Sequence, residues 1–415
     1  MLKTKFTKLE KFWVLYDVAN SAFTLLVSTI MPIYFNGLAS SAGVSETDYL
    51  AYWGYAASVS TLLVAIIGPI LGTMADMKGY KKPIFIFMLM IGVIGCAALS
   101  LPTSWIVFLA IYVIAKVGYS SSLIFYDAML SDVTEPERMD EVSSSGYAWG
   151  YIGSCIPFVL SLVIVLGNEA IGISMGTAMA IAFCLNAAWW LVLTLPLLKH
   201  YKQTHYSEKR EHAFRDSFKV LYKTFTEIKS QKHIFVFLLA FFFFIDGVYT
   251  IIDMATAFGS ALGFDSTMLL LALLLTQIVA FPFALIFGRA AKKYSNVTLI
   301  KICIAAYTCI ALFAIQLDQV WEFWLLAVCV GMFQGGIQAM SRSYFAKIIP
   351  SEKSGEYFGL YDICGKGAAF MGTTLVGVFT QLTGSANAGI SVIAVIFIAG
   401  FFFFGKAAKL NAARE

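Results

Sequence analysis

Long apolar runs recur along the whole chain of 415 residues, and this feature restricts the fold more than any other. Each run is long enough to cross the hydrocarbon core of a bilayer, about 30 Å thick, as an α-helix. Charged residues make up 13% of the chain, whereas a soluble protein carries about 25%. Membrane-spanning β-strands would instead be short and would alternate polar with apolar residues. The sequence therefore predicts a polytopic, all-α membrane protein.

Polar breaks divide the apolar runs into twelve predicted membrane spans. They cover residues 12–36, 50–75, 83–101, 104–130, 143–166, 171–198, 233–258, 267–288, 297–317, 320–345, 357–381 and 388–406. We expect two six-helix bundles, over residues 1–198 and 233–415, joined by a linker over residues 199–232. Within the linker, apolar and basic residues alternate at helical spacing, which predicts a surface helix against the membrane or the bundles. The apolar positions are Phe214, Phe218, Leu221, Phe225 and Ile228, and the basic ones are Arg215, Lys219 and Lys223.

Lysine and arginine gather in one set of connections. The residues before the first span hold four lysines, the 199–232 linker holds nine basic residues, and the six connections on the other side hold none. Basic residues favour cytoplasmic loops. The sequence therefore predicts that both termini are cytoplasmic. The first residues lead directly into a span and show no cleavable signal peptide. The lysine-rich N-terminus is also not a convincing transit peptide, so we expect a bacterial inner-membrane protein.

The two halves resemble each other in sequence. "GPILGTMADMKGYKK" ends the second span and "FALIFGRAAKKYSN" ends the eighth, at an offset of about 216 residues. "YDAMLSDVTEPER" ends the fourth span and "SRSYFAKIIPSEK" ends the tenth, at an offset of about 215. Two six-helix repeats joined by a linker describe a large architecture of secondary transporters.

The stretch "GTMADMKGYKK" resembles the signature of the major facilitator superfamily between spans 2 and 3. Gly72, Asp76, Gly79, Lys81 and Lys82 match the pattern Gly-x-x-x-Asp-Arg-x-Gly-Arg-Arg, while Met77 and Tyr80 stand where it has basic residues. The resemblance implies the twelve-helix major facilitator fold. It also implies that Asp76 belongs to a charge cluster that locks the cytoplasmic side.

Four further stretches resemble the autophagy-related vacuolar effluxer branch of that superfamily and its bacterial members. They are "LYDVANSAF", "IFYDAMLSDV", "FFIDGVYTI" and "IIPSEKSGEYFGLYDICGKGAAFMG". The resemblance covers both halves of the chain. It implies export of amino acids or similar solutes, because fungal members are associated with amino-acid export from the vacuole.

Charged side chains inside the predicted spans mark the expected transport site. Asp246 and Asp253 share a face of the seventh span with Tyr249, and Lys116 lies near the middle of the fourth span one turn from Tyr119. A charge in hydrocarbon costs several kcal/mol, roughly 2.5–3.5 on insertion scales, so such residues face a cavity or a partner. We expect substrate binding or coupling at these positions. The alternative is a set of static ion pairs, with Asp246 bound to Lys116 or Lys366.

Five more charged residues are expected to form a cytoplasmic gate. Asp17, Asp127 and Arg342 lie at similar depth, and Asp127 and Arg342 match at the repeat offset of 215. Asp76 and Asp362 complete this set. Asp362 and Lys366 are spaced i, i+4, which also fits a local ion pair on one helix.

Uncharged polar residues extend the expected binding site. Asn20 lies deep in the first span, and Gln277, Gln334 and Gln338 lie on the eighth and tenth spans. Together with Lys116, Tyr119, Asp246, Tyr249, Asp253 and Lys366, they form the predicted substrate-binding or coupling set. A site with both lysine and aspartate suits a zwitterion, each charge compensating one end of the ligand.

Other classes of membrane protein have less support. No metal-ligand spacing and no phosphate-binding loop occurs in the sequence, so we expect neither an enzyme nor an ATP-driven pump, and no cofactor or metal. We predict a monomeric secondary transporter that moves a small zwitterion, an amino acid first, with protons as a coupling ion, in contact with membrane lipids and without a nucleic-acid partner. A lipid or lysolipid flippase and a non-transporting receptor or scaffold of the same fold are the alternatives.

Overall fold

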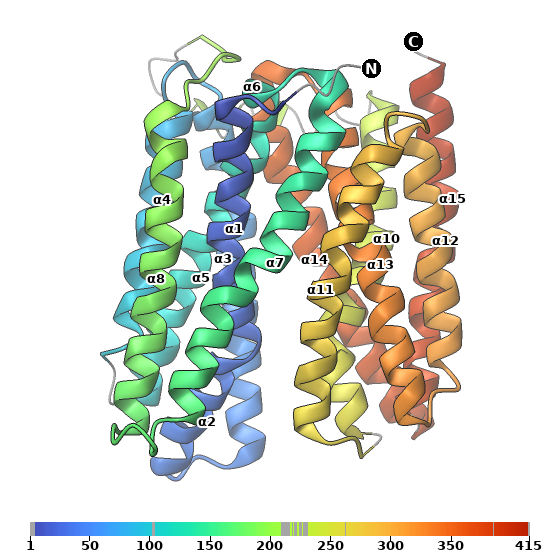
Figure 1. The fold of residues 1–415 in the computed structure, drawn as a ribbon. Helices are drawn as coiled ribbons and strands as arrows, with labels where there is room; N and C mark the ends of the chain where they lie inside the picture. Colours follow the sequence, from blue (N-terminus) through green and yellow to red (C-terminus); the bar gives the residue numbers. More distant parts are fainter. Residues whose placement is uncertain are drawn as a thin grey trace.

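The structure is a computed structural model that describes residues 5–101, 104–208, 216–217, 219, 222–223, 226, 231–261, 263–384 and 386–413. Within these residues, twelve helical segments are long and apolar enough to cross a membrane, as the sequence predicts. They form two bundles that stand side by side (Figure 1). The prediction of an all-α membrane protein is therefore confirmed.

The first bundle contains α1 to α8. The helices are α1 (Lys8–Ser28), α2 (Ile30–Ser41), α3 (Glu46–Ala75), α4 (Lys81–Ala98), α5 (Trp105–Ala128), α6 (Leu130–Val133), α7 (Met139–Leu166) and α8 (Met175–His200). The predicted first span consists of two helices, because regular geometry is interrupted at Thr29. Pro32 lies just beyond this break and has no backbone N–H to offer to the preceding turn.

The second bundle contains α10 to α15. The helices are α10 (Lys232–Ala261), α11 (Ser266–Ala290), α12 (Asn296–Ala314), α13 (Val320–Ile348), α14 (Ser354–Thr383) and α15 (Ala386–Ala412). Several helices extend beyond the predicted spans; α7 begins four residues before the fifth span and α14 three residues before the eleventh. Polar residues fill these first turns, and hydropathy alone does not assign them to a helix.

The internal repeat is visible in the backbone. A short 3-10 helix, η1 (Pro136–Arg138), follows the fourth span, and a second one, η2 (Ser351–Lys353), follows the tenth. They are 215 residues apart, as are the first residues of α5 and α13. Equivalent residues in the two bundles can therefore be compared directly.

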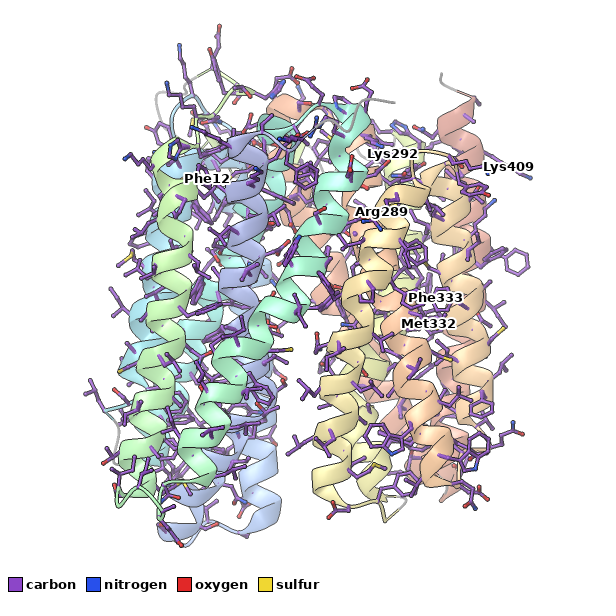
Figure 2. All side chains as sticks on the ribbon, in the orientation of Figure 1. Phe12, Arg289, Lys292, Met332, Phe333 and Lys409 are labelled. Carbon is purple, nitrogen blue, oxygen red and sulfur yellow. The ribbon has the colours of Figure 1, made fainter. Side chains whose placement is uncertain are left out.

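Both termini lie at the same end of the molecule (Figure 1). We call this the basic end, because it also carries the lysine-rich connections after α3, α8 and α11, and we call the opposite end the distal end. Arg289, Lys292 and Lys409 lie toward the basic end (Figure 2). Of the predicted linker helix, Lys219 and Lys223 are helical, while Arg215 and its apolar residues lie outside the described residues.

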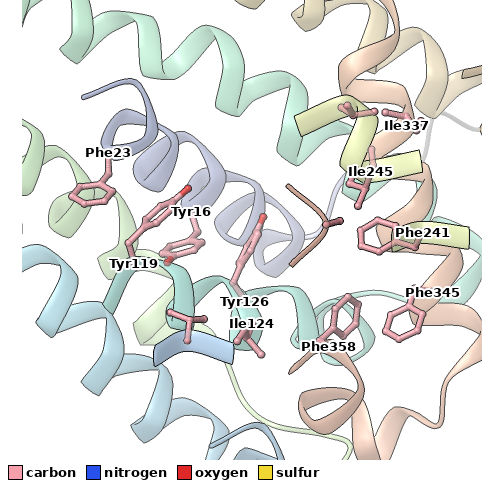
Figure 3. Packing of buried hydrophobic residues seen from close by; sticks show 14 of the residues in the cluster. Tyr16, Phe23, Tyr119, Ile124, Tyr126, Phe241, Ile245, Ile337, Phe345 and Phe358 are labelled. Atoms are coloured by element: carbon pink, nitrogen blue, oxygen red, sulfur yellow. The ribbon is translucent and has the colours of Figure 1, made fainter. Parts of the chain in front are cut away.

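Aromatic and aliphatic side chains from both bundles form one hydrophobic core (Figure 3). The first bundle contributes Tyr16, Tyr119 and Tyr126 to it, and the second contributes Phe241 and Phe345. Between the bundles, α3 packs on α14, and α7 packs on α11 and α13. These helices carry the residues that join the two halves.

Two glycines near the basic end bring the backbones of α3 and α14 into close contact. A Cβ atom on Gly72 of α3 would collide with the carbonyl of Gly355 on α14, and a Cβ on Gly355 would collide with Gly72. Glycine at both positions therefore lets two backbones touch. In the same connection Gly79 has φ +81°, a conformation that other residues rarely adopt.

Candidate functional site

Arg342 reaches from the second bundle into the first, toward the basic end. Its side chain is 2% exposed on α13, and its guanidinium lies 3.0 Å from Asp127 and 3.3 Å from Asp17. Its Nε donates to the Ser143 hydroxyl at 2.9 Å, and Nη2 donates to the Ser143 carbonyl at 3.0 Å. One cation thus joins α13 to α1, α5 and α7. The structure brings together the three residues that the sequence placed at one depth.

Aromatic rings enclose the Arg342 guanidinium. Tyr147, Trp13 and Tyr126 place their ring centroids 4.3, 4.7 and 5.5 Å from its central carbon. Tyr126 also donates its hydroxyl to Asp17 at 2.8 Å. Cation–π attraction is larger when water is excluded, so the rings stabilise a cation that burial would otherwise penalise.

Asp76 joins the bundles at a second point. Its two carboxylate oxygens accept the backbone N–H groups of Gly355 at 2.7 Å and Glu356 at 2.9 Å, in the first turn of α14. A helix N-terminus favours a negative charge because its first N–H groups have no partner within the helix. Burial nevertheless raises the pKa of Asp76 to about 7, against the lowering effect of Lys81 and of the two backbone donors.

Further polar contacts between the bundles lie at the same end. Lys81 donates to the Ser354 hydroxyl at 2.9 Å, beside the Asp76 contact. On the other side of the interface Asp140 accepts from Lys347 at 2.6 Å and from Asn296 at 2.7 Å.

Lys292, in the connection after α11 and labelled in Figure 2, pairs with Glu141 at 2.7 Å. Together with Arg342 and Asp76, these contacts close the basic end.

Asp132 was not among the predicted site residues, although it is a centre of this network. Its carboxylate pairs with the buried Lys81 at 3.2 Å and accepts the Tyr201 hydroxyl at 2.6 Å. It also accepts the backbone N–H groups of Thr204 at 3.1 Å and His205 at 2.8 Å. Burial alone would raise the pKa of Asp132, but Lys81 and these donors outweigh it and hold the pKa below its ordinary value.

Residues 201–208, which we call the strap, follow α8 and lie against the connection between α3 and α4. Gln203 accepts the backbone N–H of Gly79 at 3.0 Å and donates to the carbonyl of Ala75 at 3.0 Å. Ser207 donates its backbone N–H to the Asp76 carbonyl at 2.7 Å and accepts from Lys78 at 3.1 Å. The strap therefore holds the connection that presents Asp76 to α14.

Four charged residues remain partly exposed between Arg342 and the distal end. Lys116 of α5 interacts electrostatically with Asp253 of α10 and with Lys366 of α14. Asp253 is exposed and Lys116 is half-buried, and among the described residues no direct ion pair to Lys116 is found. Lys366 pairs with Asp362 one turn earlier on α14, with side chains 22% and 16% exposed. The first bundle thus contributes one lysine to this region, and the second contributes one lysine and two aspartates.

Tyrosines line the same region. Tyr119 donates to or accepts from the Thr24 hydroxyl at 2.6 Å, and its ring lies 5.8 Å from the Lys116 ammonium. Tyr249 of α10 is half-buried and interacts electrostatically with Asp362 and with Tyr119 across the interface. These contacts place Tyr119 and Tyr249 beside the charges that the sequence assigned to the transport site.

Asp246 lies inside the second bundle. It is fully buried, and its Oδ1 accepts the backbone N–H of Gly372 on α14 at 2.9 Å and the Thr250 hydroxyl at 3.3 Å. Its Oδ2 has no hydrogen-bond partner among the described residues. The expected alternative, an ion pair with Lys116 or Lys366, is not formed. By helical spacing, Asp246 and Asp253 share one face of α10. In the structure Asp246 lies in the interior of the second bundle, whereas Asp253 is exposed.

The uncharged polar residues lie in several environments. Asn20 is buried and donates to the carbonyl of Tyr16, one turn earlier on its own helix, at 2.7 Å. Gln277 and Gln334 line a cavity within the second bundle, and Gln338 is half-buried on α13. Among the described residues, no group of three or more potential ligands could hold a metal ion.

Residues 7–415 match the family described as "Vacuole effluxer Atg22 like". The chain belongs to this family. It is 42% identical over 401 residues to the MFS-type transporter YxiO of Bacillus subtilis (strain 168), covering 95% of this chain and 94% of that protein. It is 25% identical over 459 aligned positions to autophagy-related protein 22 of Saccharomyces cerevisiae (strain ATCC 204508 / S288c), covering 90% and 86%.

Solved structures of major facilitator transporters share the fold of this Atg22-like chain. The human organic anion transporter MFSD10 superposes with a TM-score of 0.71 at 15% identity, covering 96% of this chain and 99% of that one. The transporter FucP, in the outward conformation, has a TM-score of 0.71 at 14% identity, covering 96% and 97%. The predicted architecture is confirmed, and the chain is a transporter of the major facilitator type.

Proposed function

We propose that this Atg22-like protein exports a small zwitterionic solute, an amino acid first, by alternating access. The two bundles rock about a central site, and the polar contacts of the basic end open and close in each cycle. The conformation described here has that end closed by Arg342, Asp76 and Asp140. FucP, which has the same fold, is in an outward conformation, and this similarity supports assigning the present conformation to the outward-facing state.

One observation carries the choice of a zwitterion. Lys116, Asp253, Asp362 and Lys366 come from both bundles, carry both signs, and keep part of their side chains exposed. The Arg342 guanidinium, in contrast, is fully engaged by two carboxylates and Ser143. The ammonium group of a zwitterion can pair with Asp253 and its carboxylate with Lys116. Each charge then has a partner, and the net charge of the cavity does not change.

The proposed function includes the orientation of the protein in the membrane and the direction of transport. The excess of lysine and arginine at the basic end supports a cytoplasmic location for both termini in a bacterial inner membrane. The description of the family as an effluxer supports export. In this orientation the closed gate faces the cytoplasm.

Coupling to protons is assigned to Asp246. Its Oδ2 has no partner, so this oxygen accepts a proton without breaking the bonds that Oδ1 makes to Gly372 and Thr250. The carboxylate lies on α10, the helix that also carries Asp253 and Tyr249. Protonation at Asp246 therefore changes the charge inside the bundle at a helix that contacts the central site.

The first experiment is ligand screening by thermal shift on purified full-length protein. Ligand at 100 times its dissociation constant adds about 2.7 kcal/mol to stability. We expect selective stabilisation by amino acids, lost in Lys116→Gln and Asp253→Asn and retained in Lys409→Gln, an exposed lysine at the basic end. Stabilisation by lysolipids alone would replace the zwitterion with an amphiphile as cargo.

Transport in proteoliposomes tests the mechanism. We expect Asp246→Asn to retain exchange of labelled against unlabelled substrate but to lose accumulation driven by a pH gradient. Full accumulation in Asp246→Asn would overturn the coupling role. Absence of any transport by the wild-type protein, with binding intact, would favour a receptor instead.

A further inference from the structure

A cavity of about 230 Å³, partly open to its surroundings, lies among the helices of the second bundle. All six helices from α10 to α15 contribute to it, and its walls are almost entirely apolar. Representative lining residues are Met254, Phe258, Ala272, Ala327 and Val330. An apolar cavity of about 150 Å³ stays dry and accepts benzene. The present cavity is larger and can hold a ring or a branched or medium-length aliphatic chain.

At the corresponding residues the first bundle carries larger side chains, whose aromatic rings contact one another. Trp53 stacks on Tyr112 with ring centroids 4.5 Å apart, and Phe35 stacks on Trp53 at 5.7 Å. The repeat offset of 215–216 residues relates Trp53 to Leu269 and Tyr112 to Ala327. The stacked pair of the first bundle is thus a leucine and an alanine in the second.

The same replacement occurs on the neighbouring helix. Leu99, which is fully buried in the first bundle, corresponds to Ala314 at the offset of 215, and Ala314 lines the cavity. The smaller side chains split the distal core of the second bundle. Leu269, Ala272, Leu317 and Phe323 form a hydrophobic cluster separate from the main core.

A cavity of this kind is costly when empty, because the atoms that line it lose dispersion contacts on one side. The first bundle shows that the same fold can be filled at these positions. The difference between the repeats therefore points to an occupant rather than to a constraint of the architecture.

One polar atom in the wall lacks a partner. Gln334 is 5% exposed and lines the cavity; its side chain interacts with the Tyr151 hydroxyl, but its Oε1 accepts no hydrogen bond among the described residues. Thr276, by contrast, already donates to the carbonyls of Ala272 and Ala327. A buried amide oxygen without a donor is costly, so the matching ligand carries an N–H or O–H group.

We propose that this cavity is a binding site for a small apolar group with a single hydrogen-bond donor, such as an aliphatic alcohol or a phenol. The hydrocarbon part fills the space left by Ala327 and Ala314, and the donor bonds to Gln334 Oε1. The residues that line the site all belong to the second bundle, and none of them is charged. It therefore binds its ligand independently of the zwitterion proposed above.

Photolabelling of the full-length protein tests the proposal. The probe is a diazirine-bearing 1-hexanol, compared with its methyl ether, and labelled residues are mapped by mass spectrometry. We expect labels on lining residues such as Met254 and Val330, several-fold stronger with the alcohol than with the ether. Gln334→Leu should remove this difference between the two probes while hydrocarbon labelling persists.

Filled variants supply the matched comparison. Ala327→Tyr introduces the residue that the first bundle has at the equivalent position, Tyr112. Ala314→Leu does the same for Leu99. If one variant fails to fold, the other still tests the site. We expect both to abolish cavity labelling. Leu325→Phe, on the exposed side of α13, should leave it unchanged.

Labels confined to membrane-facing residues, or undiminished in both folded filled variants, would overturn the site. Competition distinguishes the source of the occupant. Displacement of the probe by lysophosphatidylcholine would identify a lipid chain as the hydrocarbon, and displacement by free hexanol alone would identify a soluble alcohol. Either result supports the cavity as a binding site.

Discussion

Asp127 and Arg342 occupy equivalent positions in the two repeats, 215 residues apart, and they pair with each other at 3.0 Å. The equivalent position therefore holds an acidic residue in the first repeat and a basic residue in the second. The pair lies between the bundles, where the pseudo-symmetric helices α5 and α13 both face the interface. An interaction of this kind can break only when the bundles separate, which makes it a suitable lock for the basic end.

Removing the Arg342 charge should open the basic end. Arg342→Gln leaves Asp17 and Asp127 close together without a cation, and breaking a buried pair costs about 3–5 kcal/mol. We expect spin labels at Lys199 and Lys409, both exposed at this end, to show longer distances than in the wild-type protein. The exchange Asp127→Arg with Arg342→Asp should recover part of the closed population. Unchanged distances in Arg342→Gln would show that the other contacts suffice.

Lower pH should favour the closed basic end through Asp76. Its pKa is about 7 when closed, whereas a carboxyl exposed to water has its ordinary value of 3.8. Between these two pKa values the closed state therefore binds more protons than the open state. The resulting stabilisation of the closed state is complete below the lower value and is lost as pH rises through about 7. The closed-to-open ratio should change by up to about tenfold per pH unit.

Distance measurements between pH 5 and 8 check this dependence. Asp76→Asn, which cannot ionise, should show a flat profile in the same range. A profile with the same slope in Asp76→Asn would assign the titration to another group.

The sequence predicts the lock better than the interior of the bundles. Depth along a helix can be counted from its basic end, and that count brought Asp17, Asp127 and Arg342 together. The i, i+4 spacing likewise indicated the pair of Asp362 and Lys366. These inferences need only helix length and spacing, which the apolar runs determine.

Rotation of a helix about its own axis was harder to infer. α10 is apolar on nearly all sides, so its hydrophobic pattern does not indicate which face meets the other bundle. The sequence therefore predicts Asp246 at the central site, whereas in the structure its side chain points into the second bundle. The same ambiguity placed Gln277 and Gln334 with the charged residues rather than at the apolar cavity. Asp132 was missed because its partners lie in the strap, an irregular segment about 70 residues later.

Loss of the Asp132 charge should loosen the strap. Asp132→Asn leaves Lys81 buried beside a neutral group, a loss of about 3–5 kcal/mol by analogy with other broken buried pairs. We expect faster amide hydrogen exchange at Thr204 and His205 and a lower melting temperature. Glu169→Gln, at the distal end, is the control for a lost carboxylate.

The wild-type contribution of Asp132 should be insensitive to pH between 5 and 8. Its pKa is lowered by folding, so the stabilisation is present above the ordinary value and is lost only as pH falls through the lowered one. Strap protection that declined between pH 8 and 5 would contradict this assignment.

The contact between Asp246 and α14 predicts opposite effects for two glycines on the same helix. A Cβ at Gly372 would collide with Asp246 and Thr250, whereas a Cβ at Gly377 meets nothing within 4 Å. Gly372→Ala should therefore cost about 1–3 kcal/mol through overpacking. Gly377→Ala should be neutral or stabilise the helix by up to about 1 kcal/mol. Melting temperatures of the two variants in one detergent check the contrast, and equal values would show that α14 does not approach Asp246 as closely as the structure places it.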